Sequence, residues 1–346
     1  MCPRVSPALI RKAYAIDRCL PLLLPQCRNI EQAIQELRWL KEELGCTKNS
    51  YDSGNNNIPN PPLLRQACKL RSRGVPLQYI LGSQPFGSLE ILCKRNVLIP
   101  RWETEEWSLE LSRCISSYFT RQNSELGGNS FRVLDLCTGT GCIALTVLRE
   151  TCQSLSSAGI LLDVTAIDCS PAAVKLTEQN YVHNFPVQSA AFGSAKLKFK
   201  FKFNVFQSDI LSSRFPVSRY SPVDILTANP PYIPREEFVK EVRSSVRAYE
   251  PSLALLGDIE FYRDLVDRWI AGGYINSFVY ELGSLEQFKY VRKRVVENPE
   301  LCDLWSIGIR HDSNGKPRCV YGFKGTNSSG LNIDFAELFN GFGRLV

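Results

Sequence analysis

The sequence predicts an α/β protein in which a mostly parallel sheet follows a small helical domain. The chain has 346 residues, which corresponds to about two domains at roughly 150 residues each. From residue 131 onward, short apolar runs alternate with helix-length segments, a pattern typical of a parallel sheet with helices on both faces. Before that point, apolar residues recur at three- and four-residue steps, which indicates amphipathic helices.

Three successive parts are expected along the chain. They are a helical domain over residues 26–76, a hairpin connector over 77–105 and the α/β domain over 106–346. Within the helical domain, the apolar period predicts one helix over residues 30–45 and a shorter one over 62–73. The stretch between them is polar and rich in Gly, Asn and Pro, so we expect a loop there.

Seven segments of the α/β domain have the length and apolar content of strands. They are residues 131–136, 161–167, 201–206, 223–228, 275–282, 303–310 and 318–324. Helices are expected between them, over residues 142–155, 171–182, 259–271 and 284–297. Lysine alternates with apolar residues over 196–203, which favours a half-buried strand whose lysines discourage edge pairing; a strip that meets nucleic acid phosphates is the alternative.

Positive charge is concentrated near the N-terminus. Of the formal net charge of +6, residues 1–125 carry +5, from 17 basic and 12 acidic side chains. The first 30 residues contain five basic side chains and one acidic one, Asp17. This basic, acid-poor start favours a mitochondrial leader over residues 1–25 and a location in the mitochondrial matrix. The alternative is a first helix with a solvated basic face, in a cytoplasmic protein.

Composition excludes several classes of protein. Hydrophobic residues make up 44% and charged residues 22%, which excludes a disordered or collagen-like chain. Apolar runs stop well short of the ~18 residues that a membrane span needs, so we expect no membrane association. Thirteen cysteines include no C-x-x-C pair, and only His183 and His311 accompany them. We therefore expect reduced thiols and no metal site.

The first strand of the α/β domain runs into a glycine-rich turn. Its polar and glycine residues are Asp135, Cys137, Thr138, Gly139, Thr140 and Gly141. Glycines allow a ligand to approach the backbone closely, and the start of the next helix offers unpaired N–H groups to a carboxylate or phosphate. The turn matches neither common phosphate-binding motif in full, so tight packing of a turn is an alternative explanation.

The second strand ends at Asp168, where dinucleotide-binding folds place an acid that accepts hydrogen bonds from ribose hydroxyls. The alternative is a helix cap, because Ser170 and Pro171 follow and suit a helix start. Ser170 can provide that cap by itself, which leaves Asp168 available. Glycine-rich turn and acid together predict an adenosine-like ligand.

The fourth strand ends in Asn229-Pro230-Pro231-Tyr232. The two prolines stiffen the backbone and push the residues before them into extended geometry. The Asn229 side chain and nearby carbonyl groups are therefore expected to form a rigid set of acceptors for a planar NH₂ group, with the Tyr232 ring packed on its flat face. A simple proline-rich turn is the alternative.

The order Asp135, Gly139-Thr-Gly141, Asp168, Asp209 and Asn229-Pro-Pro-Tyr232 resembles class I S-adenosylmethionine-dependent methyltransferases that act on amide or exocyclic amino nitrogens. Four flanking segments resemble one family of these enzymes, the peptide chain release factor N5-glutamine methyltransferases of the PrmC/HemK type. They are Gly74–Gly82, Val97–Glu105, Tyr249–Gly257 and Phe261–Leu265. The resemblance covers residues 74–324, and the segment Ile-Pro-Arg-Trp-Glu-Thr-Glu with the basic leader is most similar to the fungal mitochondrial branch.

The resemblance implies a Rossmann-like, mostly parallel seven-stranded sheet, and S-adenosyl-L-methionine as the cofactor. It places the methionine end of the cofactor at Cys137–Gly141, the ribose at Asp168, and the adenine near Asp209 and Ile210. Asn229, Pro230, Pro231 and Tyr232 would hold the glutamine of the Gly-Gly-Gln loop in a class I release factor, with Asn229 also beside the cofactor. The helical domain would recognise that partner, without direct contact to nucleic acid, and we expect a monomer.

Two residues depart from the family pattern. The family commonly has Gly where Cys137 stands and Pro where Trp102 stands. Cysteine is small enough for the turn if its φ is negative, so we expect a weaker constraint there rather than loss of activity. We expect an aromatic residue at 102 to reshape the substrate entrance.

Two other functions are compatible with the motifs. An adenine-N6 DNA or guanine-N2 rRNA methyltransferase would share the Asn-Pro-Pro-Tyr site, but the net charge of +1 over residues 126–346 argues against a base-flipping enzyme. A non-catalytic binding module is the third alternative.

Overall fold

The structure is a computed structural model that describes residues 5–45, 61–121, 130–186, 200–240, 242–325 and 331–346. These residues form two compact units. Unit 1 contains residues 1–84, 93–95 and 243–249, and unit 2 contains residues 85–92, 96–242 and 250–346. Of the lysine-rich segment 196–203, only the last four residues lie within the described part of the chain.

Unit 1 is helical, and the bounds 26–76 expected for the helical domain stay a prediction. Its helices are α1 (Pro7–Ile16), α2 (Leu20–Cys27), α3 (Ile30–Glu43), α4 (Pro61–Ser72), α5 (Leu77–Leu81) and α10 (Ser244–Tyr249). Asn29 begins α3 because its side chain accepts a hydrogen bond of 2.7 Å from the backbone N–H of Gln32. Helices α3 and α4 confirm the two predicted helices, whereas α5 occupies the start of a stretch predicted as a hairpin.

The N-terminal segment takes part in the core of unit 1. Ala13 of α1 and Leu20, Leu23 and Leu24 of α2 are fully buried. The leader predicted over residues 1–25 covers all four side chains. Its boundary stays a prediction.

Unit 2 contains an eight-stranded sheet in the order β10-β8-β9-β7-β6-β3-β4-β5 within the described residues. The strands are β3 (Ser130–Leu136), β4 (Leu161–Asp168), β5 (Phe201–Gln207), β6 (Ile225–Ala228), β7 (Ser277–Glu281), β8 (Trp305–His311), β9 (Pro317–Lys324) and β10 (Arg344–Leu345). β7, β6, β3, β4 and β5 are parallel, and β8, β9 and β10 pair antiparallel. The mostly parallel sheet is confirmed, and the two-residue strand β10 adds to the seven predicted strands.

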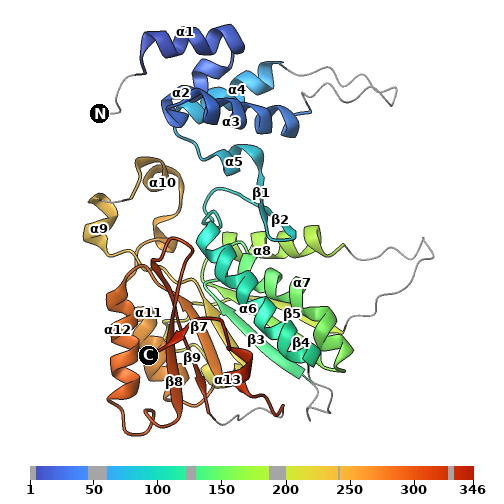
Figure 1. Ribbon diagram of the computed structural model, residues 1–346, viewed down its shortest axis with the longest axis vertical. Coiled ribbons are helices and arrows are strands. Elements are labelled where there is room, and N and C mark those ends of the chain that lie inside the picture. The colour runs from blue at the N-terminus through green and yellow to red at the C-terminus, as the bar shows by residue number, and fades with distance from the viewer. Residues whose placement is uncertain (1–4, 46–60, 122–129, 187–199, 241, 326–330) are drawn as a thin grey trace, which may run out of the picture. The chain divides into compact units, whose positions relative to one another are not determined.

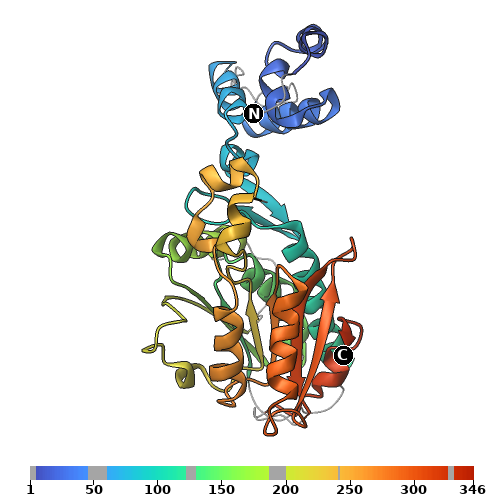
Figure 2. The same cartoon turned by 90° about the vertical axis from the view of Figure 1, so that its left-hand side faces the viewer.

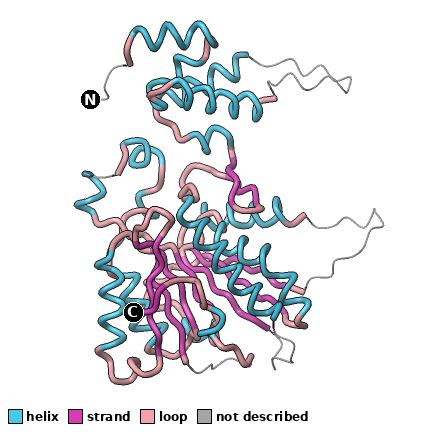
Figure 3. Tube along the Cα trace, in the orientation of Figure 1, coloured by secondary structure: helices cyan, strands magenta, loops and turns pink. Residues whose placement is uncertain are grey.

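Helices cover both faces of this sheet (Figures 1 and 3). One face packs against α6 (Trp102–Arg121), α7 (Cys142–Ser157) and α13 (Phe335–Leu338), and α8 (Pro171–Asn184) packs at its β4–β5 side. The other face packs against α11 (Glu260–Asp264), the π-helical turn Leu265–Ile270 and α12 (Leu285–Val296), which lies along β8 and β9 in Figure 2. Alternate residues of β3, β4, β6, β7 and β9 enter the two cores, as the period of a strand requires.

The remaining elements are short. β1 (Ser83–Phe86) and β2 (Leu89–Leu92) form the predicted hairpin, and α9 (Arg235–Lys240) follows the fourth strand. The predicted helix over 259–271 is α11 continued by the π-helical turn. Among the described residues, two 3₁₀ turns complete the helical elements, Val217–Tyr220 and Ser252–Ala254 in unit 2. In unit 1, α2 ends at Arg28, which adopts a left-handed backbone conformation.

No helix of the described residues is both long and apolar enough to cross a membrane. The eleven cysteines that the structure describes are free. Within the same residues, no group of three or more His, Cys, Asp or Glu side chains is placed to hold a metal ion.

The strand order determines where a ligand site is expected. The chain leaves β3 toward β4 and β5 on one side, and later returns to β6 and β7 on the other side. In open sheets of this kind, ligands bind beyond the carboxyl ends of the strands at such a change of direction.

Candidate active site

Unit 2 contains a cavity of about 480 Å³ where β3, β4 and β6 end, a volume typical of small-molecule sites. Nine of the predicted site residues line it. They are the loop residues Cys137, Thr138, Gly139 and Thr140, then Asp168, Asp209 and Ile210, and finally Asn229 and Pro231. The cavity lining does not include Asp135, Gly141, Pro230 or Tyr232. The three motifs found along the sequence thus meet at one cavity.

The glycine-rich turn adopts three left-handed backbone conformations. The φ angles are +55° at Cys137, +61° at Gly139 and +81° at Gly141. Cys137 therefore lacks the negative φ on which the expectation of a weaker constraint depended, and this turn needs the conformation that the family commonly provides with glycine. A Cβ on Gly141 would lie 2.7 Å from the Cγ2 atom of Thr177, so this glycine serves the packing of α7 against α8. Gly139, in contrast, has open space beside it.

Asp135 lies beneath the cavity rather than in its wall. Its carboxylate is fully buried and accepts hydrogen bonds from the hydroxyls of Thr138, at 2.6 Å, and Thr227, at 2.8 Å. Burial raises the pKa of Asp135 to about 7, although both hydrogen bonds oppose the shift. Asp135 therefore ties the turn after β3 to β6.

Asp168 is held in place by backbone N–H groups. Gly139 donates to one carboxylate oxygen and Ser170 to the other, both at 2.9 Å. Ser170 caps α8 through the N–H of Ala173, as predicted. Burial raises the pKa of Asp168. The carboxylate is thus engaged on its protein side while it lines the cavity, and its contact with a ribose stays a prediction.

S-Adenosylmethionine fits the residues at this cavity. Open space beside Gly139 lets a ligand approach the backbone, and the carboxylates of Asp168 and Asp209 supply acceptors for hydroxyl and amino groups. Ile210 and Leu98 give apolar walls for a flat ring. The loop leads into the N-terminus of α7, where the helix dipole suits a carboxylate.

The Asn-Pro-Pro-Tyr segment is fitted closely to its surroundings. A Cβ on Gly257 would lie 2.2 Å from the Pro231 oxygen, and one on Gly283 would lie 2.5 Å from the ring of Tyr232. Gln287 donates a hydrogen bond of 3.0 Å to the backbone oxygen of Tyr232. The segment is therefore closely packed, and its rigidity stays a prediction. The Tyr232 side chain faces these neighbours, and its stacking on a substrate amide stays a prediction.

A buried carboxylate behind this segment escaped the reasoning from sequence. Glu281 ends β7, is fully buried, and accepts hydrogen bonds from Thr104, Trp107 and Tyr232 at 2.7, 2.8 and 3.2 Å. Burial raises the pKa of Glu281, whereas the hydrogen bonds and the charge of Arg318 act in the opposite direction. The search for polar residues at the carboxyl ends of the parallel strands, which found Asp168 and Asn229, would also have found Glu281 at the end of β7.

A second carboxylate supports the opposite wall. Glu250 accepts from the Arg101 guanidinium at 2.8 and 3.0 Å and from the backbone N–H of Ile99 at 3.3 Å. Its side chain is only 1% exposed. Arg101 and the neighbouring residues 96–98 line the cavity. Glu250 lies within Tyr249–Gly257, one of the segments that resemble the family, but the sequence does not indicate that its carboxylate pairs with Arg101.

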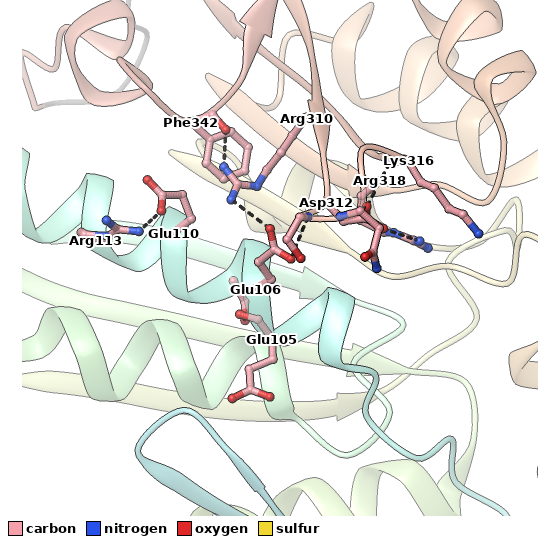
Figure 4. Close-up of polar contacts among 12 residues, drawn as sticks. Glu105, Glu106, Glu110, Arg113, Arg310, Asp312, Lys316, Arg318 and Phe342 are labelled. Atoms are coloured by element: carbon pink, nitrogen blue, oxygen red, sulfur yellow. Dashed lines mark hydrogen bonds and ion pairs between the residues drawn. The ribbon is translucent and has the colours of Figure 1, made fainter.

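Ion pairs attach the start of α6 to the β8–β9 hairpin (Figure 4). Arg318 lies 2.9 Å from Asp312 and 3.7 Å from Glu103, and Arg310 lies 3.8 Å from Glu106. Because α6 carries Thr104 and Trp107, these contacts help to fix the residues that reach Glu281. Trp102 at the start of the helix is 46% exposed.

A Rossmann-like sheet with a glycine-rich turn after its first strand, an acid after the second and Asn-Pro-Pro-Tyr after the fourth defines a class I S-adenosylmethionine-dependent methyltransferase. The cofactor is S-adenosyl-L-methionine.

Comparison with known proteins identifies the family. No family model matches the chain. The mitochondrial MRF1 N(5)-glutamine methyltransferase MTQ1 of Saccharomyces cerevisiae is 42% identical over 344 residues, which cover 99% of this chain and 95% of that protein. The probable MRF1 mitochondrial N(5)-glutamine methyltransferase mtq1 of Schizosaccharomyces pombe is 33% identical, over 89% of this chain and 94% of that one. The release factor glutamine methyltransferase of Flavobacterium psychrophilum is 30% identical, over 71% and 74%.

The chain therefore belongs to the release factor N5-glutamine methyltransferase family, as the resemblance predicted. These relatives favour protein methylation over the DNA or rRNA alternative.

Proposed function

We propose that this protein methylates the side-chain amide nitrogen of the glutamine in the Gly-Gly-Gln loop of a mitochondrial class I peptide chain release factor, and so supports translation termination. The observation that carries the proposal is the position of Asn229. It lines the same cavity as Cys137–Thr140, so an amide held by Asn229 would lie beside the expected methyl donor. The names of the relatives support the choice of substrate and of the mitochondrial matrix.

The reaction requires alignment more than proton transfer. An amide nitrogen is a weak nucleophile because its lone pair is shared with the carbonyl group. S-Adenosylmethionine supplies a methyl group on a positively charged sulfur, so the new nitrogen–carbon bond forms as the sulfur–carbon bond breaks, and the amide proton leaves to water. Neither His183 nor His311 lines the cavity. Holding nitrogen and methyl carbon in line contributes several kcal/mol of barrier lowering.

Asn229 and the Pro230 carbonyl would orient the substrate NH₂ group by accepting its hydrogen bonds and would stabilise the positive charge that develops on nitrogen. Asp168, Asp209 and Ile210 would hold the nucleoside, and residues 137–141 the methionine end. We also propose that the helical domain over residues 26–76 recognises the release factor, and that the enzyme acts as a monomer without direct contact to nucleic acid.

The test uses labelled S-adenosylmethionine and a mitochondrial release factor with either Gln or Glu at the loop position. We expect label to enter only the glutamine form. Equal labelling of both forms would place the methyl group elsewhere, and failure to label either form would refute the proposed substrate.

Substitution of Asn229 tests the site itself. Asn229→Ala should abolish methyl transfer while the affinity for the cofactor changes little, because the substrate amide loses one of its two acceptors and with it the alignment toward the methyl group. Asn340→Ala changes an exposed asparagine outside the cavity lining and is the matched control. Normal turnover by Asn229→Ala would contradict the assigned role.

A further inference from the structure

The carboxylate of Glu281 determines the direction of a buried hydrogen-bond chain. Glu281 is fully buried at the end of β7, and the hydroxyl of Thr104 lies 2.7 Å from its Oε2 atom. The Trp107 indole donates to the same oxygen, and the Tyr232 hydroxyl donates to Oε1. The three donated hydrogen bonds and the charge of Arg318 favour the ionised form of Glu281, and an ionised carboxylate only accepts hydrogen bonds. The single hydroxyl proton of Thr104 is therefore committed to Glu281.

The direction of this hydrogen bond determines which end of the Asn229 amide can face Thr104. The Thr104 oxygen, having donated its proton, offers lone pairs, and it lies 3.2 Å from the Nδ2 atom of Asn229. The NH₂ end of the Asn229 amide is thereby held toward α6. Among the described residues, no group donates a hydrogen bond to the other end of this amide, Oδ1, and Asn229 lines the cavity.

The orientation of Asn229 matters for recognition. A substrate carboxamide presents its NH₂ group as a donor, which pairs with an acceptor such as Oδ1. A flipped Asn229 would present its own NH₂ group, which pairs poorly with an amide nitrogen but well with a carboxylate. The side-chain orientation of Asn229 thus separates glutamine from glutamate.

We propose that Glu281 and Thr104 are positioning residues that lock the Asn229 amide with its oxygen toward the substrate, and so give the enzyme its selectivity for glutamine over glutamate. This inference rests on the proposed function. Glu281 and Thr104 act through Asn229 and are not assigned contact with the reacting atoms. The ion pairs that attach the start of α6 to the β8–β9 hairpin hold Thr104 at the required place.

Thr104→Val tests the chain because valine has the same shape but no hydroxyl. We expect methyl transfer to the release factor to fall about 100-fold, the size of effect seen when one aligned hydrogen-bonding group is lost from an active site. The affinity for S-adenosylmethionine should stay within about threefold of the wild-type value, below the tenfold change that one aligned contact would make. Thr104→Ser keeps the hydroxyl and should recover most of the lost transfer. Thr120→Val, at an exposed threonine on the same helix, is the unchanged control.

The preference for the glutamine over the glutamate form of the release factor distinguishes a positioning role from a merely structural one, because a structural role would leave this preference unchanged. Binding of the glutamine and glutamate forms of the release factor is measured with S-adenosylhomocysteine present. We expect the wild-type preference for glutamine to shrink about tenfold or more in Thr104→Val and in Glu281→Gln, whose added NH₂ group can donate to Thr104 and reverse the chain. Melting temperatures establish whether each variant is folded. If Thr104→Val does not fold, the selectivity of Glu281→Gln tests the positioning role.

Each outcome has a distinct meaning. If a folded variant binds both forms of the release factor more weakly by the same factor, or keeps the wild-type selectivity, the positioning role is overturned while the proposed function stays intact. Absence of transfer by the wild-type enzyme to either form would overturn the proposed function, and this inference with it. A narrowed preference with cofactor binding retained supports the assignment.

Discussion

The backbone oxygen of Pro231 lies so close to Gly257 that a Cβ on this glycine would be only 2.2 Å away. The two segments are also joined by a hydrogen bond of 3.2 Å from the Gly257 N–H to the Ile233 oxygen. Gly257 therefore lets the chain that follows Glu250 pack directly against the Asn-Pro-Pro-Tyr segment. The position of Asn229 depends on this close approach.

Gly257→Ala should reduce methyl transfer at least about tenfold, because the methyl group pushes Pro231 away from its place in the cavity wall. Overpacking of this kind costs about 1–3 kcal/mol of unfolding free energy. Transfer assays and urea unfolding measure the two effects. Gly325→Ala adds a methyl group where nothing lies within 4 Å, so it controls for the substitution itself. Wild-type activity in Gly257→Ala would show that the contact is not required.

A second prediction concerns the left-handed Cys137, with φ of +55°. Cys137→Val should lower the unfolding free energy by about 2 kcal/mol, because a β-branched residue is strained in this conformation. Cys137→Gly should change it by less than about 1 kcal/mol, since relief of strain offsets the lost side-chain packing and the added chain entropy. Chemical unfolding of both variants measures the difference. Similar effects of Val and Gly would mean that backbone strain is unimportant here.

The fold and most of the cavity were accessible from the sequence because they depend on local patterns. Apolar periods located the strands, and the residues that end three of them are in the cavity wall: Cys137, Asp168 and Asn229. A parallel sheet brings such ends to one edge whatever the side chains are. The local backbone was less accessible, since the left-handed φ of Cys137 is imposed by the turn and not by cysteine.

Contacts between distant segments could not be predicted. Thr104 and Glu281 are 177 positions apart, and their 2.7 Å hydrogen bond exists only because α6 packs beside the end of β7. Nothing in the apolar period of α6 distinguishes Thr104 from a surface threonine. The ion pair of Glu250 with Arg101 could not be predicted either, because the two residues are 149 positions apart and meet only in the folded chain.

A third prediction addresses that pair. Glu250→Gln should weaken S-adenosylmethionine binding about tenfold, because the loop at Ile99–Arg101 loses the charge of its buried acceptor and at least one of its three hydrogen bonds to it. The Arg101 side chain is 31% exposed, so solvent screening limits the loss of stability to about 1–2 kcal/mol.

Equilibrium binding of the labelled cofactor measures the change in affinity. Glu42→Gln removes the carboxylate of an exposed ion pair with Arg38 in unit 1 and should leave binding unchanged. Equal affinity for the cofactor in Glu250→Gln and the wild type would show that the loop keeps its place without Glu250.

The last prediction follows from the buried carboxylate of Asp135, whose pKa is about 7 in the folded protein, compared with the ordinary value of 3.8. Because the folded protein binds this proton more tightly than the unfolded chain does, the resulting stabilisation is complete below about pH 4 and is lost as the pH rises to about 7. Asp135→Asn cannot ionise. The wild-type free energy of unfolding should therefore fall relative to that of the variant by about 3 kcal/mol between pH 5 and pH 8.

Urea unfolding of both proteins at several pH values in this window measures the difference directly. Loss of a hydrogen bond from Thr138 or Thr227 in the variant shifts its stability by an amount that does not depend on pH, so only the slope with pH reports on Asp135. A difference that stays constant from pH 5 to pH 8 would mean that Asp135 ionises below this window, and that the hydrogen bonds from the two threonines outweigh the cost of burying its charge.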